Sequence, residues 1–492
     1  MSDAPRLAAF RQASVDVTGM RARNRTYVLQ LIWRARELSR AELARQTGMS
    51  RSAVSSLVAD LLDAGLVVET GEGASSGGRR PIQLQFRDDA CVIAGLDIGS
   101  NSIKCVVGVA DAQGGVDIIG TGCATTKGMR AGDVQNRAEF VAAIRRAREE
   151  AEMMAGVELN DVIVSVSGIP LECDSSFGAW CIEGAEVAET DIRQVLRIAR
   201  ARQVAPTTDV LFCVPGHYMV DSHIDIVAPV GIRGVRLEVD VHLNIGKRET
   251  FDEIARCCKE AGLSVGTFVP NTLASGEALL RAEDREMGIA LVDIGGSTTE
   301  ISVYRGGALV FSTNLPVGGE RVTSDLSIMF QVPGVEAERL KQTSGSALSW
   351  KVGDHETVEL PVVGGMRART VARSEVAQVC EARYEEILQL VRDAIVSEGL
   401  VVGVRMPHVV FTGGASQIAN LVDLAERVLS TPCVYGEPRS VRGMVDMVRN
   451  PKYAAATGIV LYAARKRPDV WVPVTPTAPA KTLFSRLLDW IR

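Results

Sequence analysis

The chain has 492 residues, with 46% hydrophobic residues, 23% charged residues and a formal net charge of −6 at pH 7. This length is enough for several domains, and the composition is typical of a globular protein and excludes a disordered one. The negative charge gives no reason to expect that the whole chain binds nucleic acid, and no run of about 18 apolar residues is present that would predict a membrane-spanning helix.

Residues 1–90 are predicted to form a winged helix-turn-helix module. Ser39, followed three residues later by Glu42, predicts a helix that starts with a capping box. Gly48 then makes the turn, and Ser50 caps the next helix. We expect this module to be a separate domain at the start of the chain.

The module is also predicted to bind double-stranded DNA. Between residues 19 and 59 eight Arg stand against two Glu, a local charge of +6 that would attract phosphates in a salt-dependent manner. The helix after Ser50 would enter the major groove, and the Gly-rich segment that follows, with an alternating strand at 82–86, resembles a wing. The side chains expected to contact DNA are Arg51, Ser52 and Ser55 on the helix and Arg79 and Arg80 near the tip of the wing.

Residues 91–465 alternate apolar strands with amphipathic helices, which predicts an α/β fold. Three glycine-rich turns lie within this pattern, at residues 95–102, 291–300 and 409–416. The first two share one design, in which an apolar strand ends near an Asp and a Gly-rich turn with hydroxyl side chains leads into a second strand. One such turn is also common in ordinary hairpins, but three in this order are a much more specific signal.

The three turns are suited to binding a nucleotide, since glycine lets backbone N–H groups approach phosphate oxygens closely. Asp97 and Asp293 stand at the two strand ends, where they could hold Mg²⁺ through water. Glu300 is a further candidate for positioning metal or water, but no general base, and so no catalytic residue, can be assigned. The residues predicted to bind the nucleotide are Asp97, Gly99, Ser100, Asp293, Gly295, Gly296, Ser297, Thr298, Gly413 and Gly414.

The turns resemble, in order, the phosphate-1, phosphate-2 and adenosine motifs of the actin, Hsp70 and sugar-kinase superfamily. Within that superfamily, the segments that resemble the FtsA family of cell-division ATPases are 118–134, 284–310, 315–330 and 407–421. The resemblance implies an actin-like fold of two RNase H-like lobes over residues 91–465, with the extra FtsA-type subdomain at about 170–245. FtsA proteins usually carry a Lys soon after the hydroxyl residue of the first turn, whereas here Asn101 and Ser102 stand there and Lys104 comes later.

The same resemblance implies a function. It implies that the chain binds ATP with Mg²⁺, with slow or conditional hydrolysis, and that it self-associates into polymers. It also implies that FtsZ, the tubulin-like division protein, is the main partner, and that the protein acts on the inner face of the cytoplasmic membrane at the division site.

The C-terminal residues are predicted to attach the protein to the membrane. Residues 466–480 carry four prolines and read as a stiffened linker. Residues 481–492 have the pattern of an amphipathic helix that lies in the membrane interface, with basic residues opposite its apolar side. At about 1.5 Å per residue this helix is too short to cross a bilayer. The apolar arc consists of Leu483, Phe484, Leu487, Leu488, Trp490 and Ile491.

A second interpretation comes from the N-terminal module, which resembles that of ROK-family transcriptional regulators from residue 23 to residue 84. In those regulators a helix-turn-helix precedes a sugar-kinase-like domain of the same superfamily, so the chain could be a sugar-responsive repressor. The ROK family carries a Cys/His-rich zinc motif, and this sequence has ten scattered Cys with no cluster at zinc-binding spacing. The ATPase part therefore favours FtsA over the regulator.

Overall fold

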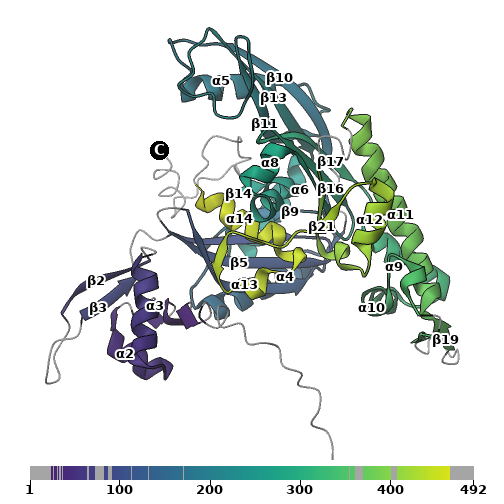
Figure 1. Ribbon diagram of the computed structural model, residues 1–492, viewed down its shortest axis with the longest axis horizontal. Helices are drawn as coiled ribbons and strands as arrows, with labels where there is room; N and C mark the ends of the chain where they lie inside the picture. The colour runs from purple at the N-terminus through teal and green to yellow at the C-terminus, as the bar shows by residue number, and fades with distance from the viewer. Residues whose placement is uncertain are drawn as a thin grey trace, which may run out of the picture.

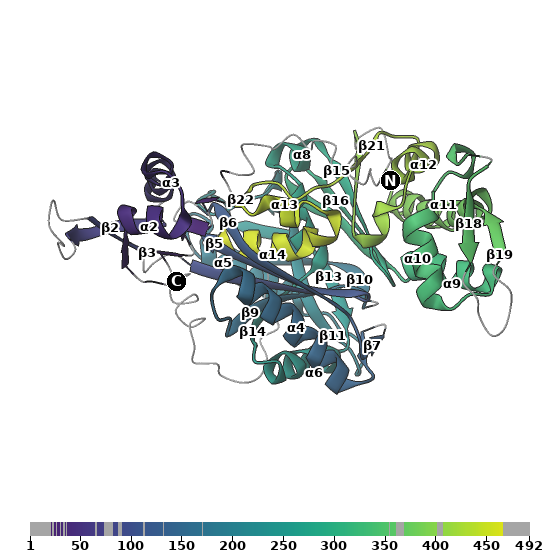
Figure 2. The ribbon, with the colours of Figure 1, turned by 90° about the horizontal axis from the view of Figure 1, so that it is seen from below.

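The computed structural model describes residues 21–465, apart from short gaps. The gaps are residues 22–23, 26, 30, 33–34, 36, 64–65, 73–81, 87–90, 112–113, 131, 170, 354, 361–368 and 401–406. Arg79 and Arg80 of the predicted wing, the predicted linker 466–480 and the predicted membrane helix 481–492 lie outside the described residues. Figures 1 and 2 place the N-terminal module at one end of the molecule and helices α9–α12 at the opposite end.

The N-terminal module has the predicted winged helix-turn-helix elements. A leading helix, with described residues between 21 and 35, is followed by a three-stranded sheet of order β1-β3-β2 and two helices. The elements are β1 (Glu37–Ser39), α2 (Arg40–Thr47), α3 (Arg51–Asp63), β2 (Val67–Glu72) and β3 (Ile82–Phe86). Its apolar core is continuous with the core of the next domain, so the module is packed against the rest of the chain.

The predicted capping signals of the module are confirmed. Ser39 Oγ accepts a hydrogen bond from the backbone N–H of Glu42 at 3.3 Å, and the Glu42 carboxylate accepts one from the backbone N–H of Ser39 at 2.8 Å. Gly48 ends α2 with φ 70°, in the left-handed region. Ser50 Oγ accepts from the N–H of Ala53 at 3.2 Å, which caps α3. Local chemistry therefore fixes where both helices of the module begin.

The first lobe is built on a six-stranded sheet of order β14-β9-β4-β5-β6-β22. Helix α4 (Arg137–Ala155) packs on β5 and β6, and α14 (Ala454–Ala464) packs on β4, β5 and β9. Alternate side chains of β5 enter different cores, with Cys105 and Val107 in one and Val106 in the other, as the two-residue period of a strand requires. The strands are β4 (Cys91–Ile98), β5 (Ser102–Ala110), β6 (Val116–Thr125), β9 (Asp161–Val166), β14 (Ser264–Val269) and β22 (Val441–Gly443).

An inserted subdomain lies between β9 and β14 along the chain. It is an antiparallel sheet of order β10-β13-β11-β12, covered by helix α5 (Glu189–Arg200). The buried face of α5 repeats at helical spacing, with Ile192, Val195 and Ala199 in a core separate from those of the lobes. The strands are β10 (Glu172–Cys181), β11 (Asp209–Val220), β12 (His223–Ile226) and β13 (Arg236–Gly246). Helix α6 (Arg248–Glu260) returns the chain to the first lobe.

The second lobe repeats the strand plan of the first. Its sheet has the order β17-β16-β15-β20-β21, with three antiparallel strands followed by two parallel ones, which is also the plan of β6-β5-β4-β9-β14. The two sheets are therefore equivalent halves of one architecture. The strands are β15 (Ile289–Ile294), β16 (Thr299–Arg305), β17 (Ala308–Leu315), β20 (Val409–Thr412) and β21 (Cys433–Tyr435).

Helices cover the outer side of the second lobe and form a separate core with its sheet. The helices are α9 (Gly319–Phe330), α10 (Gly334–Ser344), α11 (Arg373–Ser397) and α12 (Leu421–Leu429). The smaller elements are β7 (Met129–Arg130), β8 (Asp133–Val134), α8 (Ala282–Met287), η1 (Ser349–Lys351), β18 (Thr357–Leu360), β19 (Arg369–Ala372), η2 (Gly414–Gln417), α13 (Val445–Val448) and η3 (Pro451–Tyr453).

Two helices join the lobes. Helix α7 (Asn271–Leu279) and helix α14 share a core with residues from both sheets, so they lie between the lobes. No helix among the described residues is both long and apolar enough to cross a membrane. The nine cysteines whose side chains the structure describes are free thiols.

Candidate functional site

A cavity of about 1120 Å³ lies between the two lobes. The turn between β4 and β5 and the turn between β15 and β16 form one part of its wall. The third glycine-rich turn, after β20, and helices α9 and α10 form another part. The first two turns occupy equivalent places in the two sheets, so the duplicated architecture brings them to face one cavity. Its volume is slightly above the usual range of small-molecule sites, about 300–1,000 Å³.

Eight of the ten residues predicted to bind the nucleotide line this cavity. They are Asp97, Gly99, Ser100, Asp293, Gly295, Gly296, Gly413 and Gly414. The other two, Ser297 and Thr298, do not line it. Ser297 donates to the Glu320 carboxylate at 3.0 Å, and the side chain of Thr298 is buried in the turn.

The first two turns have the same backbone geometry. The N–H of Gly99 donates to the carbonyl of Ser102 at 3.1 Å, and the N–H of Gly295 donates to the carbonyl of Thr298 at 2.9 Å. Each bond closes a tight hairpin turn between two strands. The repeated design seen in the sequence is therefore a repeated structure.

Lys104 belongs to the cavity wall, although it stands later in the chain than the lysine that usually follows the first turn in FtsA proteins. It lies on β5, two residues after Ser102, and residues two apart on a strand point to the same face. Its Nζ contacts Asp97 Oδ2 at 2.8 Å, and both side chains are buried. The lysine is thus displaced along the strand but still lies beside the first turn.

Asp293 is held by two side chains of α7. Asn271 Nδ2 and Ser275 Oγ each donate to its Oδ2 at 3.1 Å. Burial raises the pKa of Asp293, and the negative charge of nearby Asp97 raises it further, against these two hydrogen bonds. Helix α7 therefore orients the carboxylate, a role that the sequence did not reveal.

Glu300 lies behind Asp293 on the neighbouring strand. Asn271 Nδ2 also donates to Glu300 Oε2 at 3.1 Å, so one amide contacts both carboxyl groups. Burial, together with the charge of Asp293, raises the pKa of Glu300 to about 8. A carboxyl group with this pKa is mostly protonated at pH 7, and it is then a donor rather than a base.

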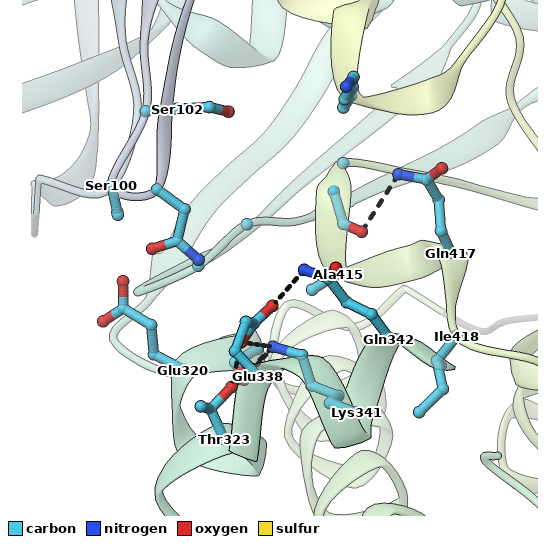
Figure 3. Close-up of a pocket in the computed structure, with 18 of the residues that line it drawn as sticks. Ser100, Ser102, Glu320, Thr323, Glu338, Lys341, Gln342, Ala415, Gln417 and Ile418 are labelled. Atoms are coloured by element: carbon cyan, nitrogen blue, oxygen red, sulfur yellow. Dashed lines mark hydrogen bonds and ion pairs between the residues drawn. The ribbon is translucent and has the colours of Figure 1, made fainter. Parts of the chain in front are cut away.

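Helices α9 and α10 contribute a second polar group that the sequence analysis missed. Lys341 Nζ contacts Glu338 at 2.6 Å, Thr323 Oγ1 at 2.8 Å and the carbonyl of Gly319 at 3.0 Å. Burial alone would raise the pKa of Glu338, but Lys341 and hydrogen bonds from neighbours hold it below its ordinary value. Figure 3 shows these side chains below the turn that carries Ala415, with Ser100 and Ser102 across the opening.

The third turn approaches the acidic group closely. Gly413 has φ 90°, and a Cβ there would lie 2.3 Å from Asp293 Oδ1. Both the left-handed backbone and the lack of space require glycine. The hydroxyl of Tyr384 on α11 donates to the carbonyl of Ala415 at 2.6 Å and fixes the turn against the helices of the second lobe.

The two aspartates fit a magnesium site of the water-bridged kind. Asp97 Oδ1 is buried and has no hydrogen-bond partner among the described atoms, so one oxygen is available for a cation. No group of three His, Cys, Asp or Glu side chains within the described residues could hold a metal by itself. Two carboxylates with water and phosphate as the remaining ligands suit Mg²⁺, which keeps much of its water.

The predicted DNA-binding helix is exposed on the module. Arg51, Ser52 and Ser55 lie on the exposed side of α3, while Val54, Leu57, Val58 and Leu61 are buried. Part of the local positive charge is used within the protein, however. Arg21 pairs with Asp60 at 2.8 Å, Arg40 pairs with Glu69 at 2.7 Å, and Arg25 pairs with Asp117 of the first lobe.

Comparisons with known proteins agree with this architecture. The family model described as "Cell division protein FtsA" matches residues 290–458, the "SHS2 domain inserted in FTSA" matches residues 168–245, and the "MarR family" matches residues 16–80. The last match is to a winged helix-turn-helix family other than ROK. The inserted subdomain described above is the SHS2 domain.

Curated relatives match over most of the chain. FtsA of Escherichia coli K12 is 34% identical over 417 residues, which covers 82% of this chain and 98% of the relative. FtsA of Bacillus subtilis 168 is 32% identical over 373 residues, which covers 75% and 83%. Among solved structures, a chain of the PilM–PilN type IV pilus biogenesis complex has a TM-score of 0.55 at 16% identity, covering 76% of this chain and 98% of that chain.

These findings confirm the expected fold, an actin-like α/β protein of two lobes with an FtsA-type subdomain and an N-terminal winged helix-turn-helix. They also decide between the two interpretations of the ATPase part, because the family models that match at 168–245 and 290–458 and the curated relatives reported above are of FtsA. The chain therefore belongs to the FtsA family of cell-division proteins.

Proposed function

We propose that the chain binds ATP with Mg²⁺ in the interlobe cavity and uses the bound nucleotide to control its assembly. The observation that carries this proposal is the convergence of three glycine-rich turns, two aspartates and Lys104 on one cavity. The N–H groups of Gly99 and Gly295 close the two turns, so the other backbone N–H groups of these turns would donate to phosphate oxygens. Lys104 would offset the phosphate charge. Asp97 and Asp293 would hold Mg²⁺, which supplies further charge neutralisation at the phosphates.

The wall formed by α9 and α10 suits the sugar end of the nucleotide. The Glu338 carboxylate accepts hydrogen bonds and Lys341 donates them, so together they can bind vicinal hydroxyl groups. The turn at Gly414 offers backbone for the base. The nucleotide would then contact both lobes at once, and its binding would hold them in one relative position.

Hydrolysis is proposed to be slow or conditional. A general base must be ionised and within reach of the attacking water, and Glu300 is mostly protonated at pH 7. Asp97 and Asp293 are assigned to the metal. No described residue is therefore named as the base, which suits a protein in which ATP controls polymer state.

Asp293→Ala tests the ATP site. The variant should keep its fold and lose most Mg-ATP affinity, because Asp293 is both the proposed metal ligand and the acceptor for Asn271 and Ser275. Equilibrium binding of Mg-ATP, with circular dichroism as the check on folding, measures both effects. Glu398→Ala, at the exposed end of α11, is the control. Equal affinity of Asp293→Ala and the parent would overturn the assignment.

The proposed cellular role is to polymerise and to tether FtsZ filaments to the inner face of the cytoplasmic membrane at the division site. It is supported by the family membership and by the amphipathic pattern of residues 481–492. A pull-down with FtsZ and with FtsZ lacking its C-terminal peptide tests the partner. Binding of FtsZ should be seen in the first case and be reduced in the second, whereas no binding in either case would contradict the role.

A second function, binding of double-stranded DNA by the module, is proposed because the polar side of α3 is exposed. Arg51→Ala in the full chain should weaken binding to a random duplex at about 50 mM salt, where phosphate contacts are strong. Lys259→Ala, at the exposed end of α6, removes one charge far from the module and is the control. A gel shift measures the binding of both variants. The absence of a shift with the parent chain would contradict DNA binding and would leave protein contact as the role of the module.

A further inference from the structure

The module is attached to the first lobe by an ion pair that the sequence does not suggest. Arg25, on the leading helix, contacts the carboxylate of Asp117 on β6. Asp117 is 2% exposed, and its other oxygen accepts from Arg442 Nη2 at 3.0 Å. Arg442 also pairs with Asp111 at 2.6 Å. One buried carboxylate therefore joins the module, the central sheet and the edge strand β22.

The two ion pairs of Asp117, with Arg25 and with Arg442, depend on each other. Burial raises the pKa of Asp117, and the charges of Arg25 and Arg442 oppose that effect. Removing one arginine would leave a buried charge only partly compensated, which is costly. The position of Arg442 therefore affects how strongly Asp117 pairs with Arg25.

The strand that carries Arg442 leads directly to the cavity. β22 has three residues and lies at the edge of its sheet, where β6 is its one neighbour among the described strands. After the short helix α13, Asn450, Pro451 and Lys452 line the cavity wall. Seven residues, 443–449, thus separate the arginine at the docking site from the first of these wall residues.

The same segment is bonded to the third glycine-rich turn. Asn450 Nδ2 donates to Gln417 Oε1 at 2.6 Å, and Thr412 Oγ1 donates to the carbonyl of Pro451 at 3.1 Å. A ligand that contacts the turn at Gly413 would therefore act on the segment from Asn450 back to Arg442.

We propose that occupancy of the cavity is coupled to docking of the N-terminal module through residues 441–453 and the carboxylate of Asp117. This inference rests on the proposed ATP site, but it does not require that the module bind DNA. Coupling between two sites is reciprocal, so whatever holds or releases the module also changes nucleotide affinity by the same factor. If the module binds DNA in a way that changes its docking, the affinities of the protein for nucleotide and for DNA are then coupled.

Hydrogen exchange on the full chain tests the coupling. Peptides from the leading helix (21–35) and from 441–453 are compared with and without the non-hydrolysable ATP analogue AMPPNP and Mg²⁺. In the parent, the nucleotide should change exchange in both segments. In Arg25→Ala, the segment 441–453 should still respond, while the leading helix should exchange faster and no longer respond.

Two further variants make the result specific. Arg45→Ala removes the same charge from the exposed side of α2 and should behave as the parent. Asp117→Asn keeps the side-chain shape but removes the buried charge. Its leading helix should also exchange faster and not respond to the nucleotide, so this variant can replace Arg25→Ala if Arg25→Ala does not fold. Nucleotide affinity should fall or rise by about 5-fold or more in the uncoupled variants, the lower range of such couplings.

The outcomes separate the two proposals. Failure of AMPPNP to bind the parent would overturn the proposed ATP site and the coupling with it. Binding of AMPPNP with no change in the leading helix would overturn the coupling alone. Equal exchange of the leading helix in the parent, Arg25→Ala and Asp117→Asn would show that the ion pair does not hold the module.

Discussion

At the scale of single residues, three acidic side chains gather at the floor of the cavity and directly behind it. Asp97, Asp293 and Glu300 lie close enough for the charge of one to raise the pKa of another, and Lys104 contacts Asp97. Such a group is costly to bury unless cations compensate it. The site is thus prepared for a cation and for the phosphates that come with it.

Lys104→Met should weaken ATP binding by roughly 10- to 100-fold, because a charged hydrogen bond to phosphate contributes about 1.5–3 kcal/mol. Methionine keeps most of the side-chain volume but leaves buried Asp97 without its cation, so circular dichroism is the check on folding. Lys259→Met on the exposed surface is the matched control. Isothermal titration with Mg-ATP measures the dissociation constants, and an unchanged constant for Lys104→Met would exclude the lysine from the site.

Glu300 predicts a pH dependence of stability in the absence of nucleotide. Its pKa is raised from 4.5 to about 8, so the folded state binds the proton more tightly than the unfolded state does. Below pH 4.5 both states are protonated. Between pH 4.5 and 8 the unfolded state loses its proton first, so the free energy of unfolding should fall as pH rises through this window.

Glu300→Gln should remove this contribution, since the amide does not titrate. Its melting temperature should fall less than that of the parent between pH 5 and 8. One pKa unit corresponds to about 1.4 kcal/mol, and the shift exceeds one unit, so the difference is measurable. Glu398→Gln on the surface should follow the parent. If the melting temperatures of Glu300→Gln and the parent change equally with pH, Glu300 is not protonated in the folded state.

At the scale of elements, the site depends on how α7 and α14 pack. A Cβ on Gly458 of α14 would lie 1.7 Å from the carbonyl of Ala274 on α7, so the two helices approach as closely as glycine permits. Since α7 carries Asn271 and Ser275, any displacement of this helix would also move the partners of Asp293.

Gly458→Ala should therefore destabilise the protein by about 1–3 kcal/mol or more, as overpacking does, and should weaken ATP binding as well. Gly184→Ala, in a loop of the SHS2 domain where the nearest atom to a new Cβ is 3.7 Å away, should change neither property. Denaturant unfolding and ATP titration measure the two effects. If Gly458→Ala leaves the free energy of unfolding unchanged, the two helices can move apart without a cost in stability.

The sequence predicted the parts of the site that have a local signature. Gly-rich turns and the capping box of Ser39 and Glu42 are visible because neighbours in the chain make them. Asn271, Glu338 and Lys341 are ordinary polar residues on helices, and only tertiary packing brings them to the cavity. Strand β22 has three residues, too few to show a two-residue period, and its partner β6 lies more than 300 residues earlier.

At the scale of the whole molecule, membrane attachment remains a prediction. A helix as short as the one predicted for 481–492 would bind a membrane weakly alone, so stable attachment should need many copies in one polymer. Deletion of 481–492, or Trp490→Glu, should reduce co-sedimentation with anionic liposomes. Trp350→Glu changes an exposed tryptophan of the second lobe in the same way and should pellet as the parent does. Equal pelleting of the deletion and the parent would refute the tether.

The closure of the first lobe by β22 also has a consequence for how the protein is made. Arg442 meets Asp117 across 325 positions of the chain, and α14, which covers the same sheet, follows β22. A ribosome delivers about 5–20 residues per second, and domains fold in the order in which they emerge. The module and the SHS2 domain can fold early, but the sheet that docks the module is completed only when nearly the whole chain has left the ribosome. A chain that is cut short before residue 441 would carry Arg25 and Asp117 but would lack Arg442, the second cation of that carboxylate, and the edge strand beside β6.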